Sequence, residues 1–354
     1  MKANLPFILQ ALLAALFFGA SAPLSKLLLG EVPPVLMAAF LYLGSGTGIA
    51  LARLSQRMTS TQKEAGIKRP DVSWLAGAIV AGGVIAPIIL MISLQHTPAS
   101  TASLLLNFEG VATTLIALFF FRESIGRRAF AAILAITLAS IFLSLNPQST
   151  GSQFSSFLSG FSLGALGILL ACTLWGLDNN FTRNISAKDP LTIVAWKGLV
   201  AGTFSLGLGL FLGQQLPSLP SILKILLLGF VSYGLSTMLF IYSMRGLGAS
   251  RTGALYGTAP LAGVILSILI FHDPLTWAFV VSAILMVAGA LMLSSEEHAH
   301  FHIHQPVVHE HRHSHDEFHA HDTANVVHSH EHEHPRAEHE HGHMPDIHHR
   351  HEDK

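Results

Sequence analysis

The pattern of hydrophobic positions divides most of the chain into long apolar runs separated by short loops rich in Pro, Gly, Ser or charge. A helix of about 20 apolar residues is long enough to cross a bilayer core of about 30 Å. The pattern therefore predicts an all-α membrane protein with ten transmembrane helices. We place these ten spans at 5–28, 33–53, 73–95, 100–121, 126–145, 161–182, 190–213, 220–244, 250–271 and 274–294.

The composition changes abruptly near residue 295. Residues 1–295 hold only 8 Asp and Glu, whereas residues 296–354 hold 13 of them together with 20 of the 22 His. A soluble domain normally devotes about a quarter of its residues to charge, so the first part does not have the composition of a soluble domain. The tail has too few large apolar residues to offset the entropy of ordering, and we predict that it is disordered.

An internal repeat relates the two parts of the membrane region. With a shift of 150 residues, "SLLLNFEGVATTLIALFFFRESI" at 103–125 falls on "GALYGTAPLAGVILSILIFHDPL" at 253–275. Similarly, "FFGASAPLSK" at 17–26 matches "LWGLDNNFTR" at 174–183. Turns and charges align as well as hydrophobic positions. The sequence thus predicts two five-helix halves, 1–148 and 149–295, followed by the tail 296–354.

The two halves should have opposite orientations in the membrane, because five is an odd number of crossings. Loops with an excess of Lys and Arg normally face the cytoplasm. The N-terminus, the basic loops and the tail are therefore expected to be cytoplasmic, in a multi-pass protein of the inner cell membrane. The basic residues lie after even-numbered spans: Arg53, Arg57, Lys63, Lys68, Arg69, Arg122, Arg127, Arg128, Arg183, Lys188, Arg245 and Arg251.

An inverted repeat is the architecture of many secondary transporters, whose substrate site lies near the midplane between the halves. The chain resembles the EamA-type branch of the drug/metabolite transporter superfamily in two motifs. One is the "FG" or "WG" that leads to a basic residue on the first helix of each half, and the other is the "FRE"/"FHD" turn before the last helix. The resemblance covers residues 5 to 295 and none of the tail. It implies a transporter that works by alternating access.

The halves depart from the family pattern in different ways. The basic residue that the family often has after the proline opening the second helix is Lys197 in the second half but Phe40 in the first. The proline common in the fourth helix is Pro260 in the second half and Gly110 in the first. The two halves have therefore diverged where the resemblance places the substrate cavity.

Ionisable residues inside spans cost about 2.5 to 3.5 kcal/mol each on insertion scales, so they usually face the bundle interior or a cavity. Glu109, in "LNFEGV", could bind a cationic group, take up a proton, or simply hydrogen-bond to a neighbouring helix. Asp178 and Lys197 have similar depths, so they could form a structural pair or a pair that substrate breaks. Consecutive residues of a helix point in different directions, so the polar run at 178–180 cannot all face one cavity. The other candidates for substrate or coupling are Asn107, Asn179 and Tyr256.

Histidine alternates with other residues, often carboxylates, along much of the tail. Imidazole is a common ligand for Zn, Ni, Co and Cu, and the sequence does not choose among these metals. We expect weak, multiple sites for divalent metal there and no cofactor required by the membrane part. The candidate ligands are His298, His300, His302, His304, His309, His311, His313, His315, His330, His332, His334, His339, His341 and His343.

These features favour a transporter of a small organic metabolite or drug-like solute, and export is the preferred direction. The tail of this transporter is expected to bind metal. One alternative is a divalent-metal (Ni, Co or Zn) exporter, and another is a metal-responsive membrane protein that moves nothing. The membrane part has only His96 and His272, both near loops, which disfavours metal as cargo. No HExxH, GxSxG or paired-Asp motif lies in a span, so we expect no enzyme. The expected partners are the solute, the lipid bilayer and metal ions but no nucleic acid, and a homodimer is left open.

Overall fold

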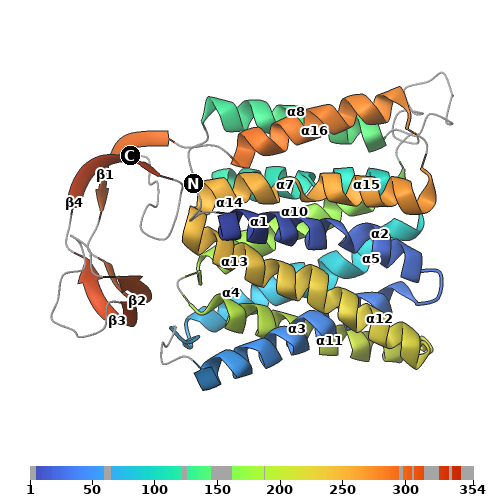
Figure 1. Ribbon diagram of the computed structural model, residues 1–354, viewed down its shortest axis with the longest axis horizontal. Helices are drawn as coiled ribbons and strands as arrows, with labels where there is room; N and C mark the ends of the chain where they lie inside the picture. Colours follow the sequence, from blue (N-terminus) through green and yellow to red (C-terminus); the bar gives the residue numbers. More distant parts are fainter. Residues whose placement is uncertain are drawn as a thin grey trace.

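The computed structural model describes residues 5–59, 65–121, 126–144, 162–186, 188–273, 275–294, 298–304, 307–314, 327–334 and 337–343. Within these ranges the prediction of ten helical spans is confirmed (Figure 1). The five spans of the first half are α1 (Leu5–Gly19) with α2 (Ser21–Leu28); α3 (Pro34–Thr59); α4 (Asp71–Ala78) with η2 (Ile79–Ile85) and α5 (Ala86–Gln95); α6 (Ala99–Leu105) with α7 (Phe108–Phe121); and α8 (Arg127–Ser144).

The second half repeats this order. Its spans are α10 (Leu163–Arg183); α11 (Pro190–Phe211); α12 (Leu219–Gly229) with η3 (Phe230–Leu235) and α13 (Ser236–Leu247); α14 (Ala249–Tyr256) with α15 (Ala259–Phe271); and α16 (Trp277–Ser294). Seven spans of the described part meet a strict criterion of length and apolarity for crossing a membrane. Large apolar side chains cover the outside of the bundle, such as Phe211 at 87%, Leu163 at 85% and Phe120 at 77% exposure. Such a surface suits lipid rather than water.

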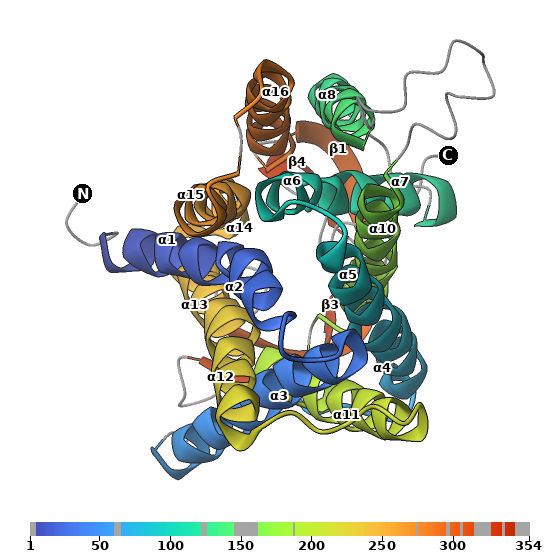
Figure 2. The same ribbon diagram turned by 90° about the vertical axis from the view of Figure 1, so that its right-hand side faces the viewer.

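The helices pack as a two-fold repeat would require. Equivalent spans lie against each other across the halves: α3 against α11, α6 against α15, and α8 against α16. The first span of each half instead packs on the other half, so that α1 contacts α13 and α15 while α10 contacts α5 and α7. Figure 2, which looks along the bundle, shows α1, α13, α14 and α15 on one side and α5, α7 and α10 on the other.

Several spans are interrupted near the middle of the bundle. The fourth span breaks between α6 and α7 at Asn107, and the ninth breaks between α14 and α15 just before Pro260. The first span breaks at Ala20, before Pro23. The third and eighth spans keep their course but contain the π-helical segments η2 and η3 at matching positions. π-Helical turns are rare and occur often at functional sites, because they release backbone groups from the regular ladder.

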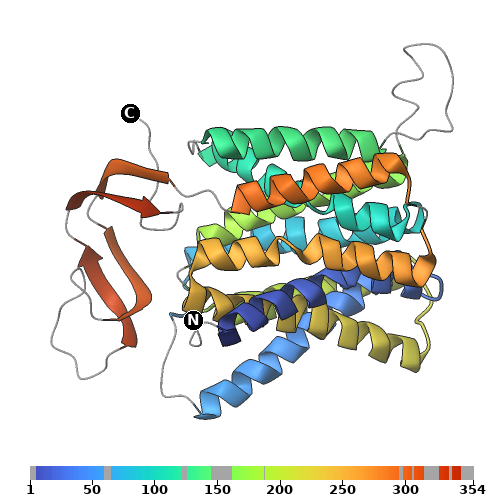
Figure 3. The same ribbon diagram turned by 45° about the horizontal axis from the view of Figure 1, so that its top comes forward.

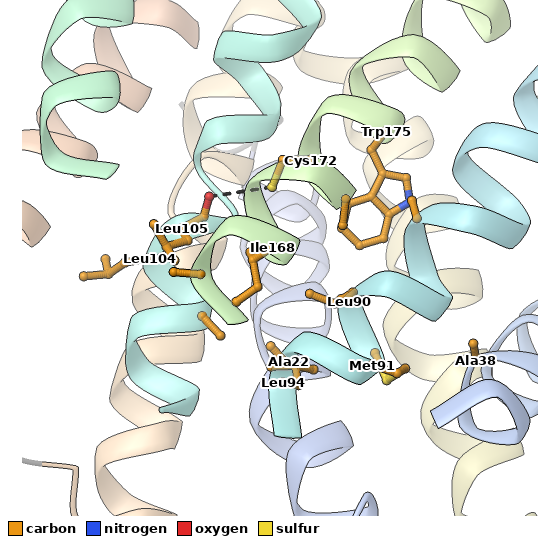
Figure 4. Packing of buried hydrophobic residues seen from close by; sticks show 14 of the residues in the cluster. Ala22, Ala38, Leu90, Met91, Leu94, Leu104, Leu105, Ile168, Cys172 and Trp175 are labelled. Atoms are coloured by element: carbon orange, nitrogen blue, oxygen red, sulfur yellow. Dashed lines mark hydrogen bonds between the residues drawn. The ribbon is translucent and has the colours of Figure 1, made fainter. Parts of the chain in front are cut away.

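Small residues allow the helices of the two halves to approach closely. A Cβ atom on Gly198 of α11 would lie 2.5 Å from the Cα of Gly46 on α3, so both positions require glycine. Gly44, Gly48 and Gly202 are similarly close to the facing helix, as is typical of residues that allow close helix packing. Around these crossings lies one large apolar core, and Figure 4 shows the part of it near Cys172, where Leu90, Leu104 and Ile168 are fully buried.

The tail differs from the expectation of disorder in four ranges. β1 (His298–His304) pairs antiparallel with β4 (Ala337–His343), and β2 (Val307–Ser314) pairs antiparallel with β3 (Val327–His334). These strands lie beside the end of the bundle where the chain begins (Figure 3). The alternation of residues has the period of a β-strand, and the argument from low hydrophobicity did not weigh this period. His315 lies outside the described residues.

Candidate solute-binding cavity

A cavity of about 1230 Å³ lies inside the bundle and is lined by residues of both halves. The structure brings all six residues that the sequence suggested for substrate or coupling to this one cavity. They are Asn107, Glu109, Asp178, Asn179, Lys197 and Tyr256. The structure establishes their position, while their role in binding remains a prediction.

Asp178 and Lys197 form an ion pair across α10 and α11. The Lys197 ammonium donates to both carboxylate oxygens of Asp178, at 2.6 and 2.7 Å. The Thr182 hydroxyl donates to the same carboxylate at 2.9 Å. A side chain at Gly82 of η2 would collide with Asp178, since its Cβ would be 2.0 Å from the Oδ2 atom. The glycine therefore makes room for a buried pair that still borders the cavity.

Glu109 lies in the first turn of α7, directly after the break in the fourth span. Partial positive charge at a helix N-terminus favours a carboxylate there. The Asn179 amide donates to Glu109 Oε1 at 2.9 Å and to the Thr113 hydroxyl at 3.1 Å. Among the residues that the structure describes, no Lys or Arg forms an ion pair with Glu109. The deep part of the cavity therefore has one carboxylate that lacks a cationic partner there.

The three consecutive polar residues of α10 have different surroundings, as expected from helix geometry. Asp178 pairs with Lys197, and Asn179 reaches Glu109. Asn180 instead donates to the backbone oxygens of Thr113 and Gly176, at 3.0 and 2.8 Å. Asn180 thus joins α10 to α7 and is not among the residues that line the cavity.

Aromatic residues that sequence reasoning had not proposed as ligands line the rest of the cavity. Phe18, Tyr42, Trp175, Tyr233 and Phe240 join Tyr256 in the lining. Trp175 is also buried, at 7% exposure. A polar contact explains two of these positions, because the Gly82 carbonyl of η2 accepts from the Tyr42 hydroxyl at 2.7 Å and from the Trp175 indole at 2.9 Å.

The cavity reaches the end of the bundle that carries the start of the chain. Its lining includes Lys188 and Pro190, at the connection between α10 and α11, and Arg245 near the end of α13. At the same end, Arg53 Nε is 2.6 Å from Asp189 Oδ2 and Lys188 Nζ is 3.5 Å from Asp71 Oδ2.

Asp189 is the N-cap of α11, and its carboxylate also accepts from the Leu191 and Thr192 amides. Burial favours the neutral acid, but the hydrogen bonds from Thr192 and Arg53 outweigh burial and lower the pKa of Asp189. The group is therefore charged at neutral pH and joins α3 to the start of α11.

Polar contacts close the opposite end of the bundle, and their residues are outside the lining of the cavity. The Lys26 ammonium donates to the backbone oxygens of Leu94 and Thr97, at the end of α5. Asp273, after α15, accepts from the Ser100 amide at 3.0 Å and from its hydroxyl at 2.7 Å. Ser221 of α12 donates to Glu31 at 3.0 Å. The cavity is thus accessible from one end in this conformation.

A cavity between two inverted halves, closed at one end and reached from the other, defines a multi-pass membrane transporter. The chain belongs to the EamA-like transporter family, whose model matches residues 5–145 and again 162–295. This confirms the resemblance drawn from the "FG"/"WG" and "FRE"/"FHD" motifs. Family members are transporters, so the chain is assigned to transport rather than to catalysis.

Individual proteins agree with this assignment. An uncharacterized transporter of Methanothermobacter thermautotrophicus is 31% identical over 294 residues, which cover 79% of this chain and 83% of the relative. A probable purine permease 7 of Arabidopsis thaliana is 24% identical over 244 residues, or 63% of this chain and 62% of that protein. A solved crystal structure shares the fold, with a TM-score of 0.57 and 18% identity over 82% of this chain and 95% of the other.

Proposed function

We propose that the protein exports a small organic solute across the cell's inner membrane by alternating access through this cavity. The observation that carries the proposal is a carboxylate, Glu109, in a mostly apolar cavity between the two halves. A carboxylate at such depth is costly unless a proton or a ligand compensates it. Glu109 is therefore proposed as the group that binds the solute or the coupling ion.

The proposed direction depends on which end of the bundle faces the cytoplasm. The basic loops and the start of the chain share the end that the cavity reaches, and such loops normally face the cytoplasm. In that orientation the conformation described above would load solute from inside the cell. Lys26, Asp273 and Glu31 would then form the closed outer end, and export would require these contacts to open.

The cargo is proposed to be organic rather than metallic. Six aromatic side chains line the cavity, and apolar lining suits an organic molecule better than a hydrated ion. One relative is named as a probable purine permease, and a purine is an organic ring compound. Both observations favour the organic-solute hypothesis over a metal exporter.

The test is exchange flux in liposomes that contain the purified full-length protein, with a panel of organic solutes inside. Glu109→Gln should reduce flux at least tenfold. A tenfold loss corresponds to a rise of about 1.4 kcal/mol in the activation free energy of transport. Glu109→Asp is the matched control, since it keeps the carboxylate at this position and should retain more flux than Glu109→Gln. Equal loss in both variants, or no loss in Glu109→Gln, would reject the Glu109 carboxylate as the central group.

We also propose that the tail binds Zn, Ni, Co or Cu ions. The strand register places His opposite His at three positions of β1 and β4 and at three of β2 and β3. Directly opposed residues of antiparallel strands share one face, at a spacing that ligands can bridge.

Metal titration of the full chain and of a chain lacking 298–354 tests this second proposal. Several ions should bind to the full chain only. Their affinity should fall as pH drops through about 6.5, because imidazole must be neutral to act as a ligand. Equal metal binding by the truncated chain would refute the proposal.

A further inference from the structure

The cavity has two chemically different walls, which face each other across it. Each wall is made of helices from both halves of the repeat. One wall, here called the polar wall, comes from α7, α10 and α11 with the break before α7. It contributes the polar side chains of Asn107, Glu109, Asp178, Asn179 and Lys197, beside Trp175. The other, here called the aromatic wall, comes from α1, η3, α13 and α14. It contributes the rings of Phe18, Tyr233, Phe240 and Tyr256, beside Thr237 and Arg245.

The internal alignment shows how this asymmetry arose from similar halves. Glu109 aligns with Ala259, and Asn107 aligns with Gly257, under the shift of 150 residues. The second half therefore lacks a carboxylate and an amide where the first half has them. Tyr256 conversely aligns with Leu106. The residues of the two halves therefore differ at these cavity positions, which suits a solute with two unlike faces.

The rings of the aromatic wall contact one another in a row, at inclined angles. The centroids of Phe240 and Tyr256 are 4.8 Å apart, those of Tyr256 and Phe18 are 5.6 Å apart, and those of Phe18 and Tyr233 are 6.0 Å apart. Tyr42 extends the row, with its centroid 5.9 Å from that of Tyr233. A planar ring system can stack on such a surface whatever its exact substituents.

The polar wall presents mainly hydrogen-bond acceptors to the cavity. Lys197 is engaged by both oxygens of Asp178, so its charge is already balanced. In the part of the chain that the structure describes, the side chain of Glu109 accepts a hydrogen bond from the neutral amide of Asn179. A carboxylate repels anions and accepts N–H donors, and carboxylates and amides recognise the donor edges of heterocyclic bases in this way.

We infer that the solute is a planar nitrogen heterocycle that stacks on the aromatic wall and directs an N–H edge to Glu109 and Asn107. This inference rests on the proposed function, because it names the class of solute that the same cavity transports. Ring and donor act together: the aromatic wall holds the flat face, and Glu109 fixes the orientation of the edge.

The experiment is equilibrium binding of 2-aminopurine to the full-length protein in lipid nanodiscs. Its fluorescence reports stacking on aromatic rings, and its N–H groups supply the donor edge. Two competitors separate the requirements: 2-(dimethylamino)-9-methylpurine keeps the ring without N–H donors, and cyclohexanecarboxamide keeps a neutral N–H donor without an aromatic ring. Each should compete at least tenfold more weakly than unlabelled adenine. Equal competition by either compound would overturn the inference.

Variants at Tyr256 assign the stacking surface. Tyr256→Leu should weaken 2-aminopurine binding roughly tenfold, within the range measured for loss of one base-stacking ring. Tyr256→Phe should retain more binding than Tyr256→Leu, because it keeps the ring. If Tyr256→Leu does not fold, Phe240→Leu serves the same purpose on the neighbouring ring. Unchanged binding in a folded leucine variant would remove the aromatic wall from the site.

The inference and the proposed function fail in different ways. If 2-aminopurine does not bind but another organic solute shows flux that depends on Glu109, the heterocycle inference is wrong and the proposed function stands. If no organic solute shows such flux, the proposed function itself is wrong.

Discussion

Neutralising the two members of the Asp178–Lys197 pair, singly and together, tests whether the pair only holds helices together. Asp178 is 5% exposed, and its side chain receives two bonds from Lys197 and one from Thr182. Removing one partner of a buried pair typically costs about 3 to 5 kcal/mol, because the remaining charge stays buried without compensation. The Lys197 side chain is 18% exposed and borders the cavity, so we expect the lower end of that range.

A loss of about 3 kcal/mol corresponds to a fall in melting temperature of roughly 6 to 12 °C in Asp178→Asn and in Lys197→Met. The double variant carries no buried charge at these two positions, so it should regain most of this stability. The coupling energy is its deviation from the sum of the two single losses. The assay is thermal unfolding in detergent, followed for each variant alongside flux in liposomes. We predict that the double variant regains stability but not flux, because the pair faces the solute. Recovery of both properties would show that the pair is purely structural.

Four further changes have definite expected outcomes. Lys26→Met should remove the hydrogen bonds to the end of α5 and so loosen the closed end of the bundle. Cysteines introduced on the inner side of that end should then react faster with a water-soluble thiol reagent, and an unchanged rate would exclude Lys26 from the closing contacts. Gly198→Leu should prevent accumulation of folded protein, because a Cβ there would lie 2.5 Å from Gly46, and a normal yield would contradict that contact. Asp189→Asn keeps the N-cap and loses the charge. Because the pKa of Asp189 is lowered in the folded protein, the charged group stabilises the fold fully above the unfolded pKa of about 3.9, and this stabilisation is lost as pH falls through the folded pKa. The difference in melting temperature between wild type and Asp189→Asn should therefore disappear in acid. Removal of residues 298–354 should leave the melting temperature of the bundle and organic-solute flux unchanged, and loss of the folded bundle would show that the tail supports it.

The ten spans could be predicted because lipid imposes a strong rule on composition. Every span must satisfy its backbone internally and expose apolar side chains, so each leaves a run of about 20 apolar residues in the sequence. The repeat was visible because turns and charges such as Lys26 and Arg183 keep matching places. Glu109 was found for a related reason, since a carboxylate in a span is expensive and rarely accidental.

The aromatic wall could not be predicted, because an aromatic residue in a membrane span is ordinary. Phe18, Tyr233 and Phe240 have the same hydrophobic signature whether they face lipid, a neighbouring helix or the cavity. Only the packing of α1 on the second half shows that these rings meet. The π-helical segments were equally hidden, although they provide the Gly82 carbonyl that accepts from Tyr42 and Trp175. Local sequence does not encode which rings converge from distant spans.

Flux of an organic solute and of a metal ion measured in the same vesicles tests the central claim most directly. Liposomes with the full-length protein would carry the panel of organic solutes, 2-aminopurine among them, together with Zn, Ni or Co ions, and each flux would be followed for wild type and for Glu109→Gln. The account predicts saturable flux of the organic solute that falls at least tenfold in Glu109→Gln, which is a rise of about 1.4 kcal/mol in the activation free energy. It also predicts metal flux no higher than in protein-free vesicles. Saturable metal flux that Glu109→Gln blocks, with no organic flux, would contradict it.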